Sequence, residues 1–311
     1  MRILIVANYN LGRFSPFIVE QIGALRKDGI EVETYGIVGK GYSGYLRNVK
    51  GIKRKIHVFL PDLIHAHYGL SGLCANLQRQ VPVITTYHGS DIHSGGWLLK
   101  LSQLAMKLSA YNIFVSTKML EMSGYKKGNA CIQSCGLDLE IMKEIPRESA
   151  RKELGLDANQ KIGLFSGSFD NPIKNSPLAK AAIERLQDVK LMELKGYSRE
   201  EVNLLMNTCD FQLTTSFRES GPLVVKEAMA CGTPVVSVDV GDVREVFGNT
   251  DGCYIAERNA DDIAEKIRMA LAFKGKTKGR QRIINLGLDN ELVSKRLVAI
   301  YREVLRRKHD G

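Results

Sequence analysis

The sequence has no apolar run of the ~18 residues that a bilayer-spanning helix requires. The first strand-like segment, residues 2–7, is apolar but short. Asn8 and Asn10 follow it, in place of the small residues that mark a signal-peptide cleavage site. We therefore expect neither a membrane span nor a secretory leader, and we expect the protein in the cytoplasm.

Metal-binding patterns are also missing. The chain has six cysteines, and the pair Cys131 and Cys135 has no second pair and no His-x-x-x-His partner, so a zinc site is not expected. It has no Asp-x-Asp run, so no metal is expected, and no other cofactor either. We expect no Gly-x-Gly-x-x-Gly fingerprint in the chain, which argues against a dinucleotide-dependent oxidoreductase, and the turn after the first strand has one glycine, Gly12.

Acidic residues are in the minority: 34 Asp and Glu stand against 44 Lys and Arg, giving a net charge of +10. Such an excess favours anionic partners, which include nucleic acids, membrane surfaces and phosphorylated ligands. It says nothing about the fold. The length of 311 residues suits one large domain or two moderate ones.

Strand-like and helix-like segments alternate along the chain, as is typical of α/β proteins with parallel sheets. Residues 31–37, 83–87 and 211–214 are among the expected strands, and Ser198 with Glu201 is expected to form a capping box at the start of a helix. A charged segment interrupts the alternation near residue 147, and a new apolar strand begins at Ile162. We therefore expect two Rossmann-like domains, residues 1–147 and residues 148–288. An amphipathic helix is expected in residues 289–311, where the apolar stripe consists of Leu292, Leu297, Ile300, Tyr301, Val304 and Leu305.

The most informative segment is residues 214–236, a predicted strand, loop, helix and second strand. Ser220 is expected to cap the helix, with Pro222 in its first turn. The free N–H groups of this helix start would lie at the sheet edge where α/β proteins bind ligands, and they attract phosphate or sugar oxygens.

Two carboxylates frame that loop, Glu219 before the helix and Glu227 inside it. A carboxylate accepts hydrogen bonds from a vicinal diol such as that of a ribose, whereas it repels phosphate. The alternative is a plain surface helix with two solvated glutamates.

The stretch from Glu219 to Glu227 resembles the Glu-x7-Glu signature of the family four glycosyltransferases, which have the GT-B fold. The continuation through Gly232-Thr233-Pro234 is similar to that family as well. The resemblance implies that Glu219 holds hydroxyls of the donor sugar and that Glu227 holds the ribose. It implies that the backbone between them meets the sugar and diphosphate, through Ser220, Gly221, Pro222 and Leu223.

Residues 164–175 resemble the family's strand and loop that bring an arginine and a lysine to the diphosphate. Lys174 matches the lysine, and a cation there would stabilise the leaving diphosphate. Ser168 stands where the arginine is usual, so one positive charge is missing. Arg218 and Arg13 are candidates to replace it.

Residues 83–91 are similar to the family's Thr-x-His-Gly motif, which implies that His88 lies beside the donor sugar. Gly12 would let the backbone approach the diphosphate. His67 is equally a candidate for the site or for the core, and His65 is expected on the opposite face of the same strand. The expected catalytic residues are therefore His88, Lys174 and Glu219.

The resemblance implies two Rossmann-like domains whose parallel sheets face a central cleft, and a C-terminal helix that crosses back to the N-terminal domain. It implies a retaining hexosyltransferase that moves a sugar from a UDP- or GDP-sugar to a glycan or glycolipid acceptor, in cell-surface polysaccharide synthesis. The nucleotide-sugar is a substrate, and neither metal nor nucleic acid is implied. Because Ser168 replaces the arginine, a catalytically inactive nucleotide-sugar-binding regulatory subunit is the alternative.

Residues 45–60 are expected to form a two-faced helix, apolar on one side and basic on the other. Its basic residues, with Trp97 in a second apolar and basic patch, favour peripheral contact with the anionic inner face of the membrane. The alternative is a helix that packs on the sheet and leaves its basic face in solvent. The basic residues are Arg47, Lys50, Lys53, Arg54 and Lys55.

Overall fold

The computed structural model describes residues 1–39 and 41–309, which form two compact units. Unit 1 consists of Met1–Gly136 together with Asn290–Gly311, and unit 2 is Leu137–Asp289. The change between units comes earlier in the chain than residue 147, where the composition changes. Leu137 already pairs with Asp289 and lies in the core of unit 2, so the charged segment is part of that unit.

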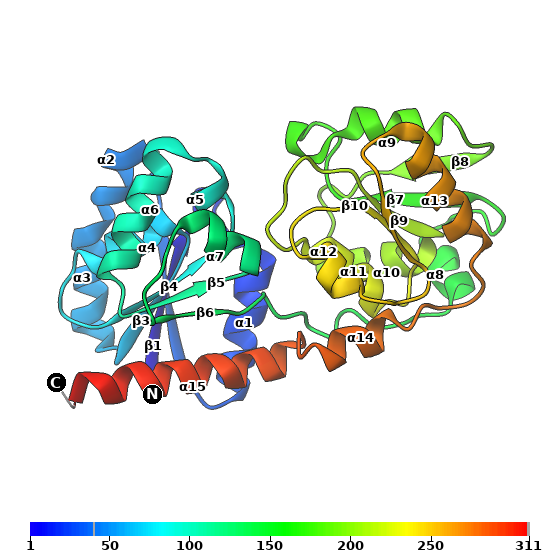
Figure 1. Ribbon diagram of the computed structural model, residues 1–311. Coiled ribbons are helices and arrows are strands. Elements are labelled where there is room, and N and C mark those ends of the chain that lie inside the picture. Colours follow the sequence, from blue (N-terminus) through cyan, green and yellow to red (C-terminus); the bar gives the residue numbers. More distant parts are fainter. Residues whose placement is uncertain (40, 310–311) are drawn as a thin grey trace. The chain divides into compact units, whose positions relative to one another are not determined.

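Unit 1 contains a parallel sheet with the strand order β2-β1-β3-β4-β5-β6 (Figure 1). Its strands are β1 Arg2–Asn8, β2 Glu31–Ile37, β3 Leu63–His67, β4 Val83–Tyr87, β5 Tyr111–Phe114 and β6 Ala130–Ile132. Its helices are α1 Pro16–Lys27, α2 Gly41–Leu46, α3 Asn48–Phe59, α4 Gly69–Asn76, α5 Ser90–His93, α6 Gly96–Leu108, α7 Thr117–Ser123 and α15 Asn290–His309.

Strand periodicity assigns the two faces of this sheet. In β1, Ile3 and Ile5 pack against α1 and α15, while Leu4 and Val6 pack against α3 and α4. All four side chains are fully buried. Because alternate side chains of β1 point to opposite faces of the sheet, this apolar strand contributes to two separate cores, one on each face.

The C-terminal helix α15 belongs to unit 1, as expected of a helix that returns to the N-terminal domain. It lies along α1, and Val293, Leu297 and Tyr301 enter the core that α1 shares with the sheet. Tyr301 is fully buried. The last helix therefore completes one layer of the first domain.

Unit 2 has a parallel sheet in the order β11-β10-β9-β7-β8 (Figure 1). Its strands are β7 Lys161–Phe165, β8 Val189–Met192, β9 Phe211–Thr214, β10 Val235–Val238 and β11 Cys253–Ala256. Its helices are α8 Arg147–Glu153, the 3-10 turn Pro172–Lys174, α9 Ser176–Ile183, α10 Arg199–Thr208, α11 Leu223–Ala230, α12 Val243–Phe247, α13 Ala260–Ala272 and α14 Gly279–Asn285.

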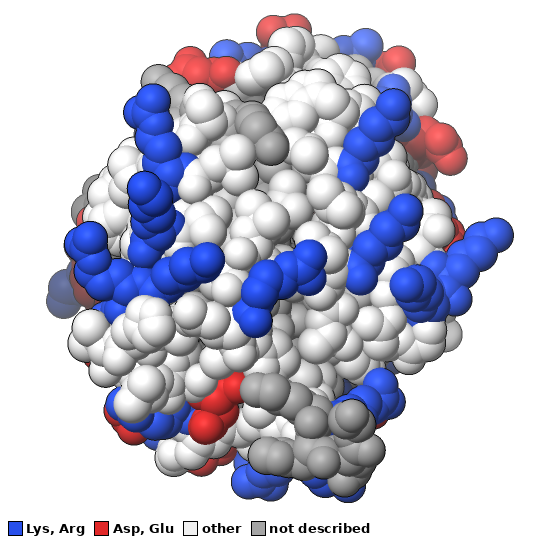
Figure 2. Space-filling model, turned by 90° about the vertical axis from the view of Figure 1, so that its left-hand side faces the viewer, with Lys and Arg blue, Asp and Glu red and all other residues white. Residues whose placement is uncertain are grey.

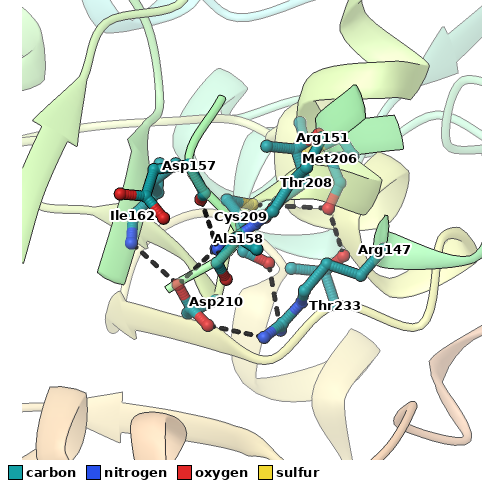
Figure 3. A network of polar contacts seen from close by, with 10 residues as sticks. All are labelled: Arg147, Arg151, Asp157, Ala158, Ile162, Met206, Thr208, Cys209, Asp210 and Thr233. Atoms are coloured by element: carbon teal, nitrogen blue, oxygen red, sulfur yellow. Dashed lines mark hydrogen bonds and ion pairs between the residues drawn. The ribbon is translucent and has the colours of Figure 1, made fainter. Parts of the chain in front are cut away.

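Asp210 organises the edge of this sheet where the strands begin, opposite the strand ends at which α/β proteins bind ligands. Its carboxylate accepts the backbone N–H of Ile162 at 2.7 Å and pairs with Arg147 and Arg151 at 2.6 and 3.1 Å (Figure 3). Arg151 also donates to the carbonyl of Thr208 at 3.1 Å. The charged segment that follows the domain boundary thus attaches α8 to β7 and β9, which is a structural role.

The amphipathic segment 45–60 is two helices, α2 and α3, which meet at Arg47. Ile52 and Ile56 are buried against the sheet, whereas Leu60, expected on the apolar side, is 64% exposed. A Cβ on Gly51 would lie 2.1 Å from Tyr35 Oη, so glycine is needed there for α3 to pack closely on β2. The helix therefore packs its apolar side on the sheet, and membrane contact through its basic side stays a prediction.

The basic residues of α3 face solvent. Figure 2 shows the face of the molecule that carries α2 and α3, where Lys and Arg are spread and acidic side chains are few. Lys55 is the exception among the basic residues, because it pairs with Glu33 at 2.8 Å. None of the helices in the described part of the chain is both long and apolar enough to cross a membrane.

Candidate functional site

In unit 2 the candidate donor site is built on the loop between β9 and α11. The helix begins at Leu223, and Pro222 is its N-cap residue, without a side-chain capping bond. The expectation that Ser220 caps this helix and that Pro222 sits in its first turn is therefore wrong. Ser220 is buried two residues before the N-cap, and the N–H groups of the first turn have no side-chain cap.

Glu219 and Lys174, both predicted from the sequence, are in direct contact. Lys174 Nζ lies 2.8 Å from Glu219 Oε1, and Ser216 Oγ donates to the same oxygen at 2.7 Å. Thr215 Oγ1 donates to the carbonyl of Lys174 at 3.0 Å, which ties the two loops together. The side chains of Lys174 and Glu219 retain 20% and 17% exposure, so a ligand can reach both.

Glu227 lies inside α11 and is nearly buried. Its Oε1 pairs with Arg199 Nη1 at 2.7 Å, at the start of α10. The capping box that Ser198 and Glu201 form, as predicted from the sequence, fixes that helix start and hence the position of Arg199. Glu227 is therefore held by a cation rather than solvated, contrary to the plain surface-helix alternative.

No role was predicted from the sequence for Lys226 and Asp242, which form an ion pair beneath the backbone of the loop between β9 and α11. Their side chains are 1% and 8% exposed and pair at 2.7 Å. A Cβ on Gly221 would lie 3.1 Å from Asp242 Oδ2 and 3.2 Å from Lys226 Nζ, so the loop backbone rests directly on this ion pair. A lysine within an apolar helix was the only signal in the sequence.

The loop after β7 shows what surrounds Ser168, where the family's arginine is usual. Ser168 Oγ lies 3.4 Å from Asp170 Oδ2, and Lys195 Nζ pairs with the same oxygen at 2.6 Å. This pair lowers the pKa of Asp170 and raises that of Lys195, and both groups are exposed. Lys195, from the loop after β8, is thus a cation of this loop cluster that the sequence did not indicate.

Gly12 and Arg13 lie in unit 1, in the loop between β1 and α1. Gly12 has φ +69°, a left-handed conformation that favours glycine, and its N–H donates to the carbonyl of Tyr9 at 3.0 Å. Arg13 lines a cavity of about 360 Å³ together with Asn8, Tyr45, Tyr68 and Asp91. Such a volume is enough for a small ligand.

His88 follows β4 and belongs to a cluster of aromatic rings in unit 1. Its ring centroid lies 4.7 Å from that of Phe17, 4.8 Å from that of Tyr68 and 5.2 Å from that of His67. His67 Nδ1 is 2.9 Å from His88 Nε2. Burial lowers the pKa of both imidazoles, that of His67 to about 3, so both rings are neutral at pH 7.

His65 shares a face with His67, which corrects the expectation that the two residues point to opposite sides. Residues two apart in a strand lie on the same face, and the two rings stack with centroids 4.6 Å apart. His65 binds Tyr301 Oη at 2.6 Å and Thr86 Oγ1 at 2.7 Å. His65 is therefore a core histidine with both nitrogens bonded.

The expectation that the chain has no Gly-x-Gly-x-x-Gly pattern is wrong, because one follows β2. Gly39, Gly41 and Gly44 have the spacing Gly-x-Gly-x-x-Gly. A Cβ on Gly39 would lie 2.8 Å from the backbone of Gly44, so the glycines permit a close approach within this turn. Among residues 1–39 and 41–309, no group of three or more His, Cys, Asp or Glu is placed to hold a metal ion.

Two family models match the chain on either side of the boundary. Residues 174–287 match the model described as glycosyl transferases group 1, and residues 15–117 match glycosyl transferase 4-like. The chain is 29% identical over 236 residues to the putative teichuronic acid biosynthesis glycosyltransferase TuaC of Bacillus subtilis. That match covers 67% of the chain and 60% of the relative, so the chain spans well under the full length of this curated relative.

Solved structures show the same fold. Sucrose-phosphate synthase from Thermosynechococcus elongatus superposes with a TM-score of 0.86 at 18% identity, over 99% of this chain and 100% of that one. Anabaena HepE in complex with UDP-glucose superposes with a TM-score of 0.72 at 18% identity, over 100% of both chains. The two family models place the chain in the group 1 glycosyltransferases, the retaining family four, and the two parallel sheets are those of the GT-B fold.

Proposed function

We propose that the protein is a retaining glycosyltransferase that transfers a sugar from a nucleotide-sugar donor to a glycan or lipid-linked acceptor. The contact between Lys174 and Glu219 carries the proposal, because it joins the two loops that the family uses for the diphosphate and for the sugar. Glu219 accepts hydrogen bonds from sugar hydroxyls, and Lys174 moves to the diphosphate when the donor binds.

The nucleotide half of the donor is bound, in this proposal, by Glu227. Its carboxylate binds the two hydroxyls of the ribose, with Arg199 holding it in place. The backbone from Ser220 to Leu223 lies on the Lys226–Asp242 pair and faces the diphosphate. HepE, which shares the fold, was crystallised in complex with UDP-glucose, and this favours a UDP-sugar over a GDP-sugar for this chain.

The reaction breaks the bond between the anomeric carbon and the donor phosphate, and charge develops on the leaving diphosphate. Lys174 and the first N–H groups of α11 stabilise that charge. The carboxylate of Glu219 is bound to Lys174 and Ser216, so we assign it to holding hydroxyls and not to nucleophilic attack. Retention then follows the same-face route: the acceptor oxygen bonds to the anomeric carbon on the face that the phosphate leaves, and the leaving phosphate takes the proton of the acceptor hydroxyl.

The cavity of unit 1 is the proposed acceptor site. Tyr45 and Tyr68 offer ring faces and hydroxyls, as saccharide sites do, and Ser15 and Ser102 add further hydroxyls. Arg13 makes no ion pair among the described residues, so it is available to an anionic group of the acceptor. An acidic or phosphorylated cell-surface polysaccharide precursor suits this lining, in line with the name of the Bacillus relative.

Isothermal titration calorimetry with UDP, GDP and ADP tests the donor half. Release of free sugar from UDP-glucose and GDP-mannose, alone and with lipid-linked or soluble saccharide acceptors, tests turnover. UDP binding together with transfer supports the enzyme. Binding without turnover of any donor favours the regulatory subunit that Ser168 suggested, and absence of nucleotide binding would overturn the assignment of the site.

A further inference from the structure

The stacked histidines of unit 1 form a defined row from the core to the end of β4. His65 and His67 are fully buried, and His88, next in the row, keeps partial exposure. The row arises because β3 pairs with β4 in a register that sets His67 opposite Thr86, two residues before His88. Side chains on the same face of two neighbouring parallel strands therefore meet at the sheet edge.

His65 has partners at both ring nitrogens. Its Nδ1 lies 2.6 Å from Tyr301 Oη and 3.5 Å from Gln21 Nε2, and its Nε2 lies 2.7 Å from Thr86 Oγ1. These contacts hold the first ring of the row in a fixed position.

The contact between His67 and His88 has two arrangements, since each neutral imidazole carries one N–H. If His88 Nε2 donated, His67 would carry its own proton on Nε2. That nitrogen is buried and has no partner within residues 1–39 and 41–309. Buried N–H groups without an acceptor are rarer than buried acceptors without a donor. His67 therefore carries its proton on Nδ1 and donates it to His88 Nε2.

We propose that His67 is a positioning residue, which fixes His88 as the tautomer with its proton on Nδ1, so that His88 donates a hydrogen bond to the transferred sugar. The proposal rests on the proposed function. In the unliganded protein His88 Nδ1 faces Cys135 Sγ at 3.6 Å. Sulfur is a weak acceptor, so a sugar oxygen replaces it readily.

The assignment has a chemical consequence. His88 Nε2 accepts from His67 and is not available to take a proton from the acceptor hydroxyl. His88 therefore acts as a fixed donor and not as a general base. Burial depresses the pKa values of the whole row, which keeps the donor neutral and its orientation constant across the working pH range.

Nitrogen-15 NMR of the full chain, labelled at histidine, reads the tautomer directly. At pH 7 the expected spectrum shows His88 with a protonated Nδ1 and a bare Nε2, and the His88→Gln variant assigns its signals. A protonated Nε2 on His88 overturns the proposal. This measurement needs no substrate, so it stands even if the proposed function fails.

Two variants of His67 separate positioning from packing. His67→Asn keeps an N–H near the place of Nδ1, whereas His67→Phe keeps a ring but has no donor. We expect His67→Phe to lower kcat by at least tenfold, to leave UDP affinity within about twofold of wild type and to change the His88 tautomer signals, whereas His67→Asn retains most of the activity. Equal activity of His67→Phe and wild type, or equal loss in both variants with unchanged His88 signals, refutes the positioning role. If the Phe variant does not fold, the wild-type spectrum decides.

Discussion

Lys174 Nζ lies 2.8 Å from Glu219 Oε1, so the cation expected at the donor diphosphate and the carboxylate expected at the donor sugar neutralise each other while the site is empty. In the proposed donor site, an arriving nucleotide-sugar would separate this pair, because the phosphates attract the lysine and the sugar hydroxyls would take its place on the carboxylate. The two side chains therefore act together, and their substitutions should have distinguishable effects.

Glu227→Ala should weaken UDP binding by about 1.5–3 kcal/mol, the usual range for hydrogen bonds to charged groups. Glu219→Ala should chiefly slow sugar transfer and spare the affinity for free UDP. Calorimetry and initial rates measure the two effects. Glu265→Ala, on the exposed surface of α13, is the matched control, because the Glu265 side chain is 65% exposed. UDP affinities equal to wild type in both site variants would show that the donor binds elsewhere.

Transfer should not depend on a metal ion. Lys174 and the helix start take the place of a divalent cation at the leaving diphosphate. Initial rates should be the same in excess EDTA and in buffer with manganese or magnesium, while Lys174→Met should lose at least tenfold in rate under both conditions. A rate that EDTA abolishes and manganese restores is the result that contradicts this.

Protein stability should depend strongly on the buried ion pair between Lys226 and Asp242. Removing one partner of such a pair leaves an uncompensated charge and costs about 3–5 kcal/mol. Lys226→Met should therefore lower the thermal midpoint strongly and, by releasing the loop at Gly221, weaken UDP binding. The double variant Lys226→Met with Asp242→Leu should recover part of the loss.

Arg244→Gln is the control, because the Arg244–Asp239 pair has a similar distance, 2.8 Å, but side chains 67% and 49% exposed. It should change stability by about 0–1 kcal/mol, as exposed pairs do. Equal losses of stability in Lys226→Met and Arg244→Gln would show that the buried pair stabilises the protein no more than the exposed pair does.

The stability of unit 1 should fall as the pH falls below about 6.5. The histidines of the buried row have folded-state pKa values below the unfolded value, that of His67 about 3, so the unfolded chain binds more protons over this range. Each such histidine contributes about 1.4 kcal/mol per pH unit. Denaturant unfolding at pH 7.5 and 5.5, followed by Trp97 fluorescence, measures this, since the only tryptophan of the chain lies in unit 1.

His67→Asn should reduce that slope by about 1.4 kcal/mol per pH unit, because asparagine does not titrate. A slope unchanged by the substitution would mean that His67 is protonated in the folded protein as well.

Anionic vesicles should bind the protein reversibly. Lys50, Lys53 and Arg54 are exposed on α3, and each basic residue near an anionic leaflet contributes about 1 kcal/mol. Co-sedimentation should require anionic lipid, weaken with salt and fall when Lys50, Lys53, Arg54 and Lys55 become glutamine. Equal recovery of the protein in the supernatant with neutral and with anionic vesicles would show that the basic side of α3 does not bind a membrane.

The sequence was most informative where one chain segment determines its own structure. The strands Glu31–Ile37, Val83–Tyr87 and Phe211–Thr214 have the predicted bounds, because apolar periodicity and flanking turn residues are local signals. The capping box of Ser198 and Glu201 was predictable for the same reason. The likeness to family four supplied the fold, which is confirmed, and the candidate residues of the donor site, which stay a prediction.

What the sequence could not supply are contacts between distant segments. Arg199 reaches Glu227, and Lys195 reaches Asp170, from loops that only the folded sheet brings together. Glycine is unfavourable inside a helix, and only the close packing of Tyr35 against Gly51 of α3 explains it. Ser220 was assigned as a cap from its residue type, whereas the helix starts later.

The return of α15 to unit 1 sets an order of events during synthesis. Unit 2 is one continuous stretch, Leu137–Asp289, and can fold as soon as it has left the ribosome. Unit 1 must wait, because the apolar side of α1 and the hydroxyl that binds His65 are completed by Val293, Leu297 and Tyr301. Of these two units, the one whose chain begins earlier is therefore the one completed later, because its last helix comes after the whole of unit 2.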